Sequence, residues 1–212
     1  KIYYNYMIMY QDISEKKHWF DAWKVFYEPE ESLEQNDPNA VTISSIDSSD
    51  GMPNSRVVLI KDVSQDGFIF YTNYESKKGQ ELFANNKASL TWWSRRQKKS
   101  VRVQGVVSKV SEKTSDEYFS SRSREAQISA SISKQSEILE SRDQLINEYN
   151  EFKKKHEGEP LSRPRSWGGM LLTPSKVEFW QSLDNYSDRL HDRVLFHLDG
   201  TNNCWKKERL YP

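Results

Sequence analysis

Three basic side chains stand at alternate positions near the end of the chain, in the segment SDRLHDRVLF. Successive side chains of a β-strand point to opposite faces, so Arg189, His191 and Arg193 would share one face of a strand. The apolar residues between and after them would occupy the other face. Arginine and protonated histidine donate charged hydrogen bonds, so this pattern predicts a local anion-binding face.

A second group of cations lies in the segment YESKKGQEL, where Lys77 and Lys78 would occupy the first turn of a helix that begins after Ser76. Positive charge at that end of a helix opposes the helix dipole. A bound phosphate would offset this conflict, because free backbone N–H groups, the serine hydroxyl and two ammonium groups would converge on it. Taken alone, the motif fits two solvated surface lysines equally well.

Further candidates are weaker when each is taken alone. Arg56 and Lys61 bracket four apolar residues in SRVVLIK, on opposite faces of a regular strand, so each end would serve a different pocket unless the strand is simply buried with charged ends. Tyr118 and Arg122 are four residues apart and would share a helix face. Trp180 is typical of a core or barrel-end position, and SKQSE, with Gln135 and Ser136, is typical of a polar loop.

The elements that must position these residues are mainly strands. Helices are predicted over 12–28, with Ser14 as its N-cap, and over 77–86, 112–122 and 141–156. Short β-rich runs fill residues 40–110, and an Asp-Gly pair at Asp66 predicts a tight hairpin between RVVLIKDV and FIFYTN. The closing strands are predicted in MLLTP, VEFWQ, RLHDRVLFHL and CWKKERLYP. This order favours an antiparallel β-barrel with peripheral helices, an α+β fold in which 1–212 form one domain with a helical insert at about 112–156.

Composition limits the function classes. Lys plus Arg and Asp plus Glu both number 31, so there is no global charge that would attract nucleic acid. No run approaches the roughly 18 apolar residues of a membrane span, and the first ten residues lack a cleavage site. The single cysteine, Cys204, excludes an internal disulfide framework and a multi-cysteine zinc site. We therefore expect a cytoplasmic protein with no metal site and no membrane or nucleic-acid partner.

Nine motifs, in this order, resemble the FMN-dependent pyridoxamine/pyridoxine 5′-phosphate oxidases. They are SRVVLIK, GFIFYTNYESKKGQEL, VRVQG, EYFSSR, SKQS, SWGGMLLTP, EFWQ, RLHDR and ERLYP, and they cover about residues 12–212. The resemblance implies an antiparallel split β-barrel that forms a homodimer and holds FMN at the subunit interface. It also implies oxidation of pyridoxamine or pyridoxine 5′-phosphate to pyridoxal 5′-phosphate. A hydride passes to the flavin, O2 is reduced to hydrogen peroxide, and the amine substrate releases ammonia.

The resemblance also implies roles for individual residues. The implied cofactor-binding residues are Arg56, Val57, Val58, Leu59, Lys61, Tyr71, Thr72, Ser76, Lys77, Lys78, Ser100, Gln135, Ser136, Trp180 and Arg193. The implied substrate-binding residues are Lys61, Tyr118, Arg122, Arg189 and His191, of which Arg189 and His191 cover the pyridine ring as the catalytic pair. In this interpretation the basic strand face serves two anionic ligands, with Arg193 toward FMN and the other two toward the substrate.

The chain departs from the family pattern at several positions. Ser100 replaces a glutamine, Ala126 replaces a serine that helps to hold the substrate phosphate, and Ser123 replaces a proline. The segment 182–188 is about three residues longer than is usual, which could displace Arg189 and His191. Two alternatives remain: another split-barrel flavin oxidoreductase, or a non-catalytic binder of pyridoxal phosphate or of single-stranded nucleic acid. The nucleic-acid alternative would use Trp92 and Trp93 as stacking platforms, and the neutral net charge argues against it.

Overall fold

The computed structural model describes residues 11–31, 37–183, 189–200 and 204–212. The helices of this part of the chain are α1 (Trp19–Glu31), α2 (Lys77–Ala84), α3 (Glu112–Ser121), α4 (Arg124–Ile132) and α5 (Arg142–Lys155). The strands are β1 (Ala40–Ile46), β2 (Pro53–Ser64), β3 (Gly67–Asn73), β4 (Lys87–Ser94), β5 (Lys99–Lys109), β6 (Trp167–Gln181), β7 (Asp192–Leu198) and β8 (Trp205–Arg209).

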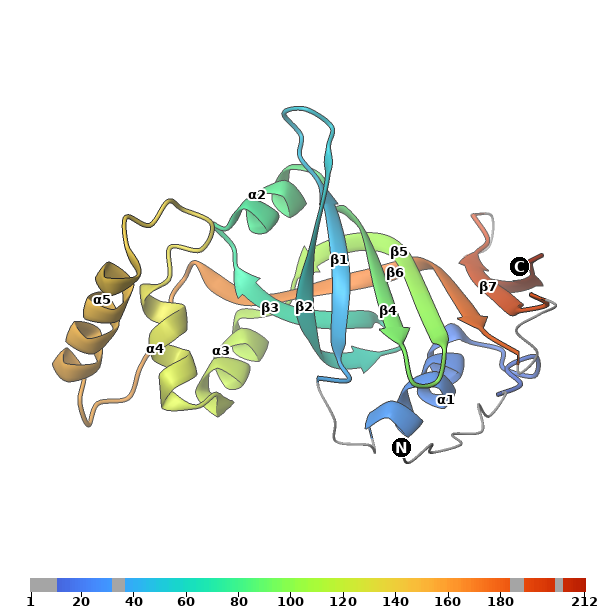
Figure 1. Ribbon diagram of the computed structural model, residues 1–212, viewed down its shortest axis with the longest axis horizontal. Helices are drawn as coiled ribbons and strands as arrows, with labels where there is room; N and C mark the ends of the chain where they lie inside the picture. Colours follow the sequence, from blue (N-terminus) through green and yellow to red (C-terminus); the bar gives the residue numbers. More distant parts are fainter. Residues whose placement is uncertain (1–10, 32–36, 184–188, 201–203) are drawn as a thin grey trace, which may run out of the picture.

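The strands form one antiparallel sheet that closes on itself. Their order is β3-β2-β1-β4-β5-β6-β7-β8, and an additional pairing of β3 with β6 closes the first six into a barrel. Strands β7 and β8 continue from β6 outside this ring, toward the end of the molecule opposite helices α3–α5 (Figure 1). The predicted fold class, an antiparallel barrel with peripheral helices, is confirmed.

Strand β6 belongs to two parts of the sheet. Its first part pairs with β3, its last part pairs with β7, and β5 runs beside both parts. The sequence predicted two separate strands here, MLLTP and VEFWQ, and that division is wrong. The proline is accommodated because the register shifts where Gly105 faces Pro174. A Cβ atom at Gly105 would lie 2.0 Å from the Thr173 carbonyl oxygen, so this close approach requires glycine.

The hairpin between β2 and β3 is confirmed, with Ser64 opposite Gly67 across the turn. Gly67 has a φ of 144°, which L side chains rarely adopt, and its Cβ would lie 2.1 Å from the Leu172 carbonyl oxygen of β6. Predicted strands AVTISSI and GFIFYTN coincide with β1 and β3. The chemistry of the turn therefore fixes the register of the strands that carry much of the candidate site.

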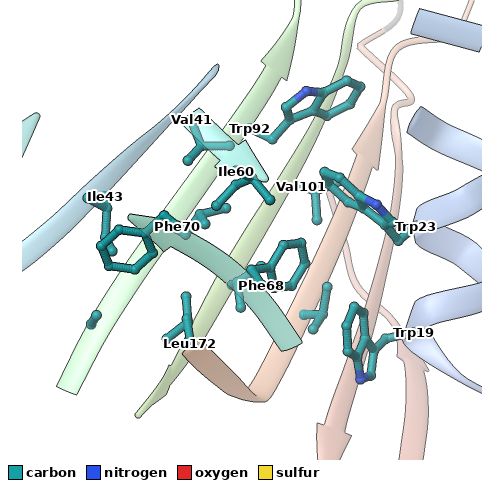
Figure 2. Packing of buried hydrophobic residues seen from close by; sticks show 14 of the residues in the cluster. Trp19, Trp23, Val41, Ile43, Ile60, Phe68, Phe70, Trp92, Val101 and Leu172 are labelled. Carbon is teal, nitrogen blue, oxygen red and sulfur yellow. The ribbon is translucent and has the colours of Figure 1, made fainter. Parts of the chain in front are cut away.

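Helix α1 begins at Trp19, seven residues later than the predicted start at 12. The N-terminal cap is His18, whose Nδ1 accepts from the Phe20 N–H at 3.2 Å, and the predicted cap Ser14 lies in the preceding turn. The aromatic face of this helix was predicted correctly: Trp19 and Trp23 are buried against Phe68 of the barrel (Figure 2). The helix therefore seals one end of the core.

Helices α2, α3 and α5 each begin after a serine that accepts a backbone N–H. The sequence predicted the starts of α2 and α3, and α5 begins one residue after its predicted start at 141. Helix α4 was not predicted as a separate helix. It begins after Ser123, and only Arg122 and Ser123 separate it from α3. Helices α3, α4 and α5 lie together at one end of the molecule (Figure 1). In the described ranges, no helix is long and apolar enough to cross a membrane.

Candidate functional site

A cavity of about 1050 Å³ lies between the barrel and helices α3 and α4. Strand β2 pairs with β1 through Pro53–Leu59 but with β3 only from Ile60 onward, so its first part has an edge with no strand beside it in the described chain. The cavity follows this edge. The predicted site residues that line it are Arg56, Val57, Val58, Leu59, Lys61, Tyr71, Thr72, Lys77, Lys78, Tyr118, Arg122, Gln135 and Ser136.

Arg56 and Lys61 both line this cavity, contrary to the expectation of separate pockets, although Lys61 also lines a smaller cavity beside α1 that Arg56 does not line. The sequence argument assumed a regular strand with a ligand against one face. Here the cavity runs along a strand edge, which both faces can reach, and the register of β2 against β3 shifts between Ile60 and Asp62. Lys61 lies at that irregularity and has an exposed side chain.

Lys78 is a buried cation whose hydrogen-bond partners are neutral groups. Its ammonium group donates to Thr72 Oγ1 and, at 3.1 Å, to Gln135 Oε1. Among the ion pairs of the described residues, it has no carboxylate partner. Burial, together with the nearby Arg56 guanidinium, lowers the pKa of Lys78 to about 8, while Glu81 raises it. This is the environment of a cation that an anionic ligand would stabilise.

The other residues at the start of α2 behave differently from Lys78. Lys77 is exposed and pairs with Asp47 at 3.1 Å, so it is a surface lysine beside the cavity. Ser76 is fully buried and does not line the cavity. Its Oγ accepts from the Gly79 N–H and donates to the Asn73 carbonyl at 2.6 Å, so its hydroxyl caps the helix. Lys77 therefore fits the interpretation of YESKKGQEL as a solvated surface motif, and phosphate binding stays a prediction for Lys78.

An aromatic cluster forms another wall of the cavity. The rings of Tyr71 and Tyr118 stack with centroids 3.8 Å apart, and Trp167 stacks beside Tyr71 at 5.4 Å. The Arg122 guanidinium lies 4.7 Å from the Trp167 ring, within cation–π range. Its Nη1 is buried and has no hydrogen-bond partner in the described structure, and burial lowers the pKa of Arg122. A buried guanidinium nitrogen without a partner favours an anion at this position.

Tyr118 and Arg122 both line the cavity, but not as residues of one helix face as predicted. Tyr118 lies in α3, whereas Arg122 is its C-cap with an extended backbone, so the two do not share a helix face. Sequence reasoning also missed Trp167, although it lies in SWGG beside two glycines that let β6 pass close to Tyr71 and Tyr74. Trp92, which the nucleic-acid alternative used as a stacking platform, is 1% exposed and belongs to the core (Figure 2).

The remaining predicted residues form a second group outside the cavity. Ser100, Trp180 and Arg193 are neighbours across β5, β6 and β7 in the sheet register. The His191 ring lies 4.8 Å from that of Trp180, and its buried Nδ1 has no hydrogen-bond partner among the described residues. We call Ser100, Trp180, Arg189, His191 and Arg193 the strand group.

The alternating pattern that placed three basic side chains on one strand face is correct only from Asp192 onward. Strand β7 begins there, so Arg189 and His191 precede it. Arg189 has a φ of 51°, outside the strand region, and both Arg189 and Leu190 are exposed. Most of the longer segment 182–188 lies outside the described residues. The sequence pattern missed this change because it has no glycine at the position of positive φ.

Arg193 is fixed by contacts that sequence reasoning did not identify. Its Nε and Nη2 both donate to Oε1 of Glu178, at 3.3 and 3.1 Å, and its Nη1 donates to the Tyr211 carbonyl at 2.9 Å. Glu178 is nearly buried and also pairs with Arg102 at 3.4 Å. The arginine is therefore held in place before any ligand binds.

Comparison with known proteins matches two family models to most of the chain. The model described as "Pyridoxamine 5'-phosphate oxidase" matches residues 29–155. The model described as "Pyridoxine 5'-phosphate oxidase C-terminal dimerisation region" matches residues 167–212. The chain belongs to the pyridoxine/pyridoxamine 5′-phosphate oxidase family. The cavity lies mainly in the first matched region, whereas most of the strand group lies in the dimerisation region.

Curated relatives in this family are similar over nearly the whole chain. The pyridoxine/pyridoxamine 5′-phosphate oxidase of Nostoc punctiforme is 43% identical over 92% of this chain and 86% of its own length. That of Brucella anthropi is 41% identical over 95% of this chain and 97% of its own.

Among solved structures, PhzG from Burkholderia lata 383, in complex with tetrahydrophenazine-1-carboxylic acid, has a TM-score of 0.88 at 27% identity, covering 96% of this chain and 98% of that one. A pyridoxamine 5'-phosphate oxidase-related, FMN-binding protein from Nostoc punctiforme has a TM-score of 0.73 at 15% identity, covering 92% and 97%. These likenesses confirm the fold.

Proposed function

We propose that this protein is an FMN-dependent oxidase that converts pyridoxamine or pyridoxine 5′-phosphate to pyridoxal 5′-phosphate and reduces O2 to hydrogen peroxide. The observation that carries the proposal is a single cavity with two cationic side chains, Lys78 without a carboxylate partner and Arg122 with a buried Nη1 that has no hydrogen-bond partner in the described structure. A cofactor phosphate would bind at Lys78 and a substrate phosphate at Arg122. Family membership supports the same pair of ligands.

The residues present fit the phosphate of FMN. Lys78 supplies a buried ammonium group without a carboxylate partner in the described structure, and Arg56 lines the same part of the cavity. Thr72 and Gln135 already bond to Lys78 and orient it. Val57, Val58 and Leu59 would lie along the flavin. When bound, FMN would supply the hydride acceptor and the site at which O2 is reduced.

The substrate phosphate would bind at the aromatic wall. Arg122 offers its buried Nη1, Tyr118 offers a phenol whose pKa is raised by burial, and Lys61 offers an exposed ammonium group. A raised tyrosine pKa keeps the hydroxyl proton in place as a hydrogen-bond donor. The stacking of Tyr118 on Tyr71 and of Arg122 on Trp167 holds the two donors in fixed orientations.

A second subunit would complete the site. Val57, at the edge of the cavity, is 68% exposed, and Leu190 beside the strand group is 66% exposed. A homodimer in which the strand group of one subunit covers the cavity of the other would bury both. The match to a dimerisation region over residues 167–212 supports this arrangement. Arg193 would then reach the flavin, and Arg189 and His191 would close over the pyridine ring.

The test uses purified protein with its flavin. We expect a yellow dimer that converts pyridoxamine 5′-phosphate to pyridoxal 5′-phosphate with one hydrogen peroxide formed for each product molecule. Pyridoxamine without its phosphate is the control, and it should react far more slowly because it leaves Arg122 unpaired. The predicted cytoplasmic location stays a prediction that cell fractionation would check.

The same experiment separates the alternatives. A yellow protein that forms neither pyridoxal phosphate nor peroxide would indicate another split-barrel flavin oxidoreductase. A colourless protein that binds pyridoxal 5′-phosphate without turnover would indicate a non-catalytic binder. Either result would contradict the proposed function.

A further inference from the structure

The Arg56 guanidinium donates three hydrogen bonds to acceptors of the protein itself. Its Nη1 donates to Ser45 Oγ at 2.6 Å and to the Asn54 carbonyl at 2.9 Å, and its Nη2 donates to Glu81 Oε2 at 3.1 Å. A guanidinium group has five N–H donors, so these bonds leave the Nε–H and one Nη2–H. Adjacent Nε and Nη2 donors form the fork that binds a phosphate through two parallel hydrogen bonds.

Glu81 is the centre of this anchor. It is 5% exposed, and it also accepts from Ser45 Oγ at 2.5 Å and from Asn54 Nδ2 at 2.6 Å. Burial opposes its ionisation, yet the hydrogen bonds from Ser45, Asn54 and Arg56 hold the pKa of Glu81 below its ordinary value. Glu81 therefore remains charged. It does not line the large cavity, although it lines a smaller cavity of about 400 Å³ that shares Lys77, Gln135 and Ser136 with the large one. Its hydrogen bond to a residue of the large cavity is the one from Arg56.

Two effects of this carboxylate oppose each other. Its negative charge would repel a nearby phosphate, but its contact with Arg56 fixes the direction of the remaining donors. A fork that is already oriented loses less conformational freedom when it binds a ligand. Glu81 also offsets one of the two cationic side chains, Arg56 and Lys78, that approach each other at the start of α2.

We propose that Glu81 is a positioning residue of the flavin phosphate site, which strengthens the binding of phosphorylated flavin by aiming the free edge of Arg56 into the cavity. The inference rests on the proposed function, because it assumes that the anion near Arg56 is the phosphate of FMN. Charge repulsion alone would make phosphate binding stronger when the negative charge of Glu81 is removed. The positioning role predicts the opposite, weaker phosphate binding.

The experiment compares the binding of FMN and riboflavin to the flavin-free protein by titration of flavin fluorescence. We expect Glu81→Gln to raise the Kd for FMN by roughly tenfold, the effect of degrading one charged hydrogen bond. The Kd for riboflavin should change by less than about twofold, since riboflavin has no phosphate for Arg56 to bind. Glu75→Gln is the matched control, because Glu75 is an exposed carboxylate just before α2, and it should change neither value.

A second measurement shows whether Glu81 acts through Arg56. In the Arg56→Ala background, Glu81→Gln should not weaken FMN binding further, because the group that it orients is gone. Ser45→Ala removes one acceptor of Arg56 and should weaken FMN binding by about threefold, again without an effect on riboflavin. If Glu81→Gln does not fold, Ser45→Ala serves as the test variant in its place.

Several results would overturn the positioning role. Tighter FMN binding by Glu81→Gln would show that charge repulsion dominates. Equal weakening for FMN and riboflavin, or the same weakening with and without Arg56, would show a general structural effect. If the wild type binds FMN and Glu81→Gln has the same Kd, Glu81 has no positioning role, while the proposed function is unaffected. A wild type that binds neither flavin would overturn the proposed function and this inference with it.

Discussion

The cavity and the strand group hold their arginines in similar ways but differ in completeness. Arg56 in the cavity is fixed by buried Glu81, and Arg193 in the strand group is fixed by nearly buried Glu178. Around Arg56 the same subunit provides walls, the buried Lys78 and the Arg122 guanidinium, whose buried Nη1 has no hydrogen-bond partner in the described structure. Around Arg193 the neighbouring sheet surface is open, with Trp93 52% exposed beside Trp180.

This difference indicates that one subunit carries two unequal halves of a site. We expect the cavity half to bind an anion by itself, because its donors line one cavity of a single chain. The strand half presents oriented donors on an open sheet surface, so we expect it to need a second chain. Mutations in the two halves should therefore have different effects on flavin binding and activity.

The largest expected effect is complementation between two inactive variants. Lys78→Ala removes the cavity half and Arg193→Ala removes the strand half, so each homodimer should have very low activity. In a mixed dimer, one of the two sites combines the intact cavity of one subunit with the intact strand group of the other. After random exchange of subunits, activity should recover to about a quarter of the wild-type value.

The control is a mixture of two cavity variants, Lys78→Ala and Arg122→Ala, which places both defects in the same half. No mixed dimer of this pair contains an intact cavity, so activity should stay low. Recovery in the control, or none in the first mixture, would show that the two groups of residues do not meet across a subunit interface.

The next prediction separates the arginines of the strand group. Arg193→Ala should reduce the flavin content of the purified protein. Arg189→Ala should leave the protein yellow and reduce kcat/KM by about tenfold to a hundredfold, the effect of losing one or two charged hydrogen bonds. His191→Ala should resemble Arg189→Ala. Normal flavin content and kinetics in both arginine variants would indicate that these side chains only form surface ion pairs.

Much of the fold could be predicted because local chemistry agrees with the tertiary structure. The Asp-Gly turn predicted the β2–β3 hairpin, serine caps predicted the starts of α2 and α3, and aromatic spacing predicted the buried face of α1. The errors have different causes. The long-range pairing of β5 with β6 joins two expected strands into one, whereas α1 is shortened by a local contact, the cap that His18 forms with the Phe20 N–H.

The candidate site was predictable in its residue types but not in its geometry. Motifs identified the donors, yet spacing alone placed Arg56 and Lys61 in different pockets and Arg189 on a strand. The carboxylates Glu81 and Glu178 were missed because each acts on a residue distant in sequence. Such contacts between distant residues leave no local pattern in a single sequence.

A third prediction uses the pH dependence of the cavity half. The pKa of Lys78 is about 8 in the flavin-free protein, below the ordinary value of 10.5, so unfolding takes up a proton between these values. The free energy of unfolding of the flavin-free protein should therefore rise as the pH increases from 8 toward 10.5, and the cost of burying this charge is fully present below pH 8.

Binding of FMN should show the opposite trend. The phosphate favours charged Lys78, so above pH 8 binding must take up a proton, and the Kd for FMN should rise by about tenfold per pH unit. Titrations of flavin fluorescence at pH 7, 8 and 9 would measure this. In Lys78→Met the Kd should be higher but nearly independent of pH over this range, and a dependence that persists would assign the titration to another group.

The smallest expected effect concerns the hydroxyl that the chain lacks at Ala126, which lines the cavity together with Arg122. Ala126→Ser would add one donor to the substrate phosphate, which by itself is worth up to a tenfold lower KM. We expect Ser123 to reduce this gain, because it also lines the cavity and its Oγ accepts from the Ala126 N–H at 3.3 Å, so its own hydroxyl proton can be donated to a ligand. We therefore expect Ala126→Ser to lower the KM for pyridoxamine 5′-phosphate by no more than about threefold.

Steady-state kinetics would measure this change in KM. The matched control is Ala130→Ser, which lies one turn later in α4 and also in the cavity wall. A tenfold or larger decrease would show that Ser123 does not replace the missing hydroxyl.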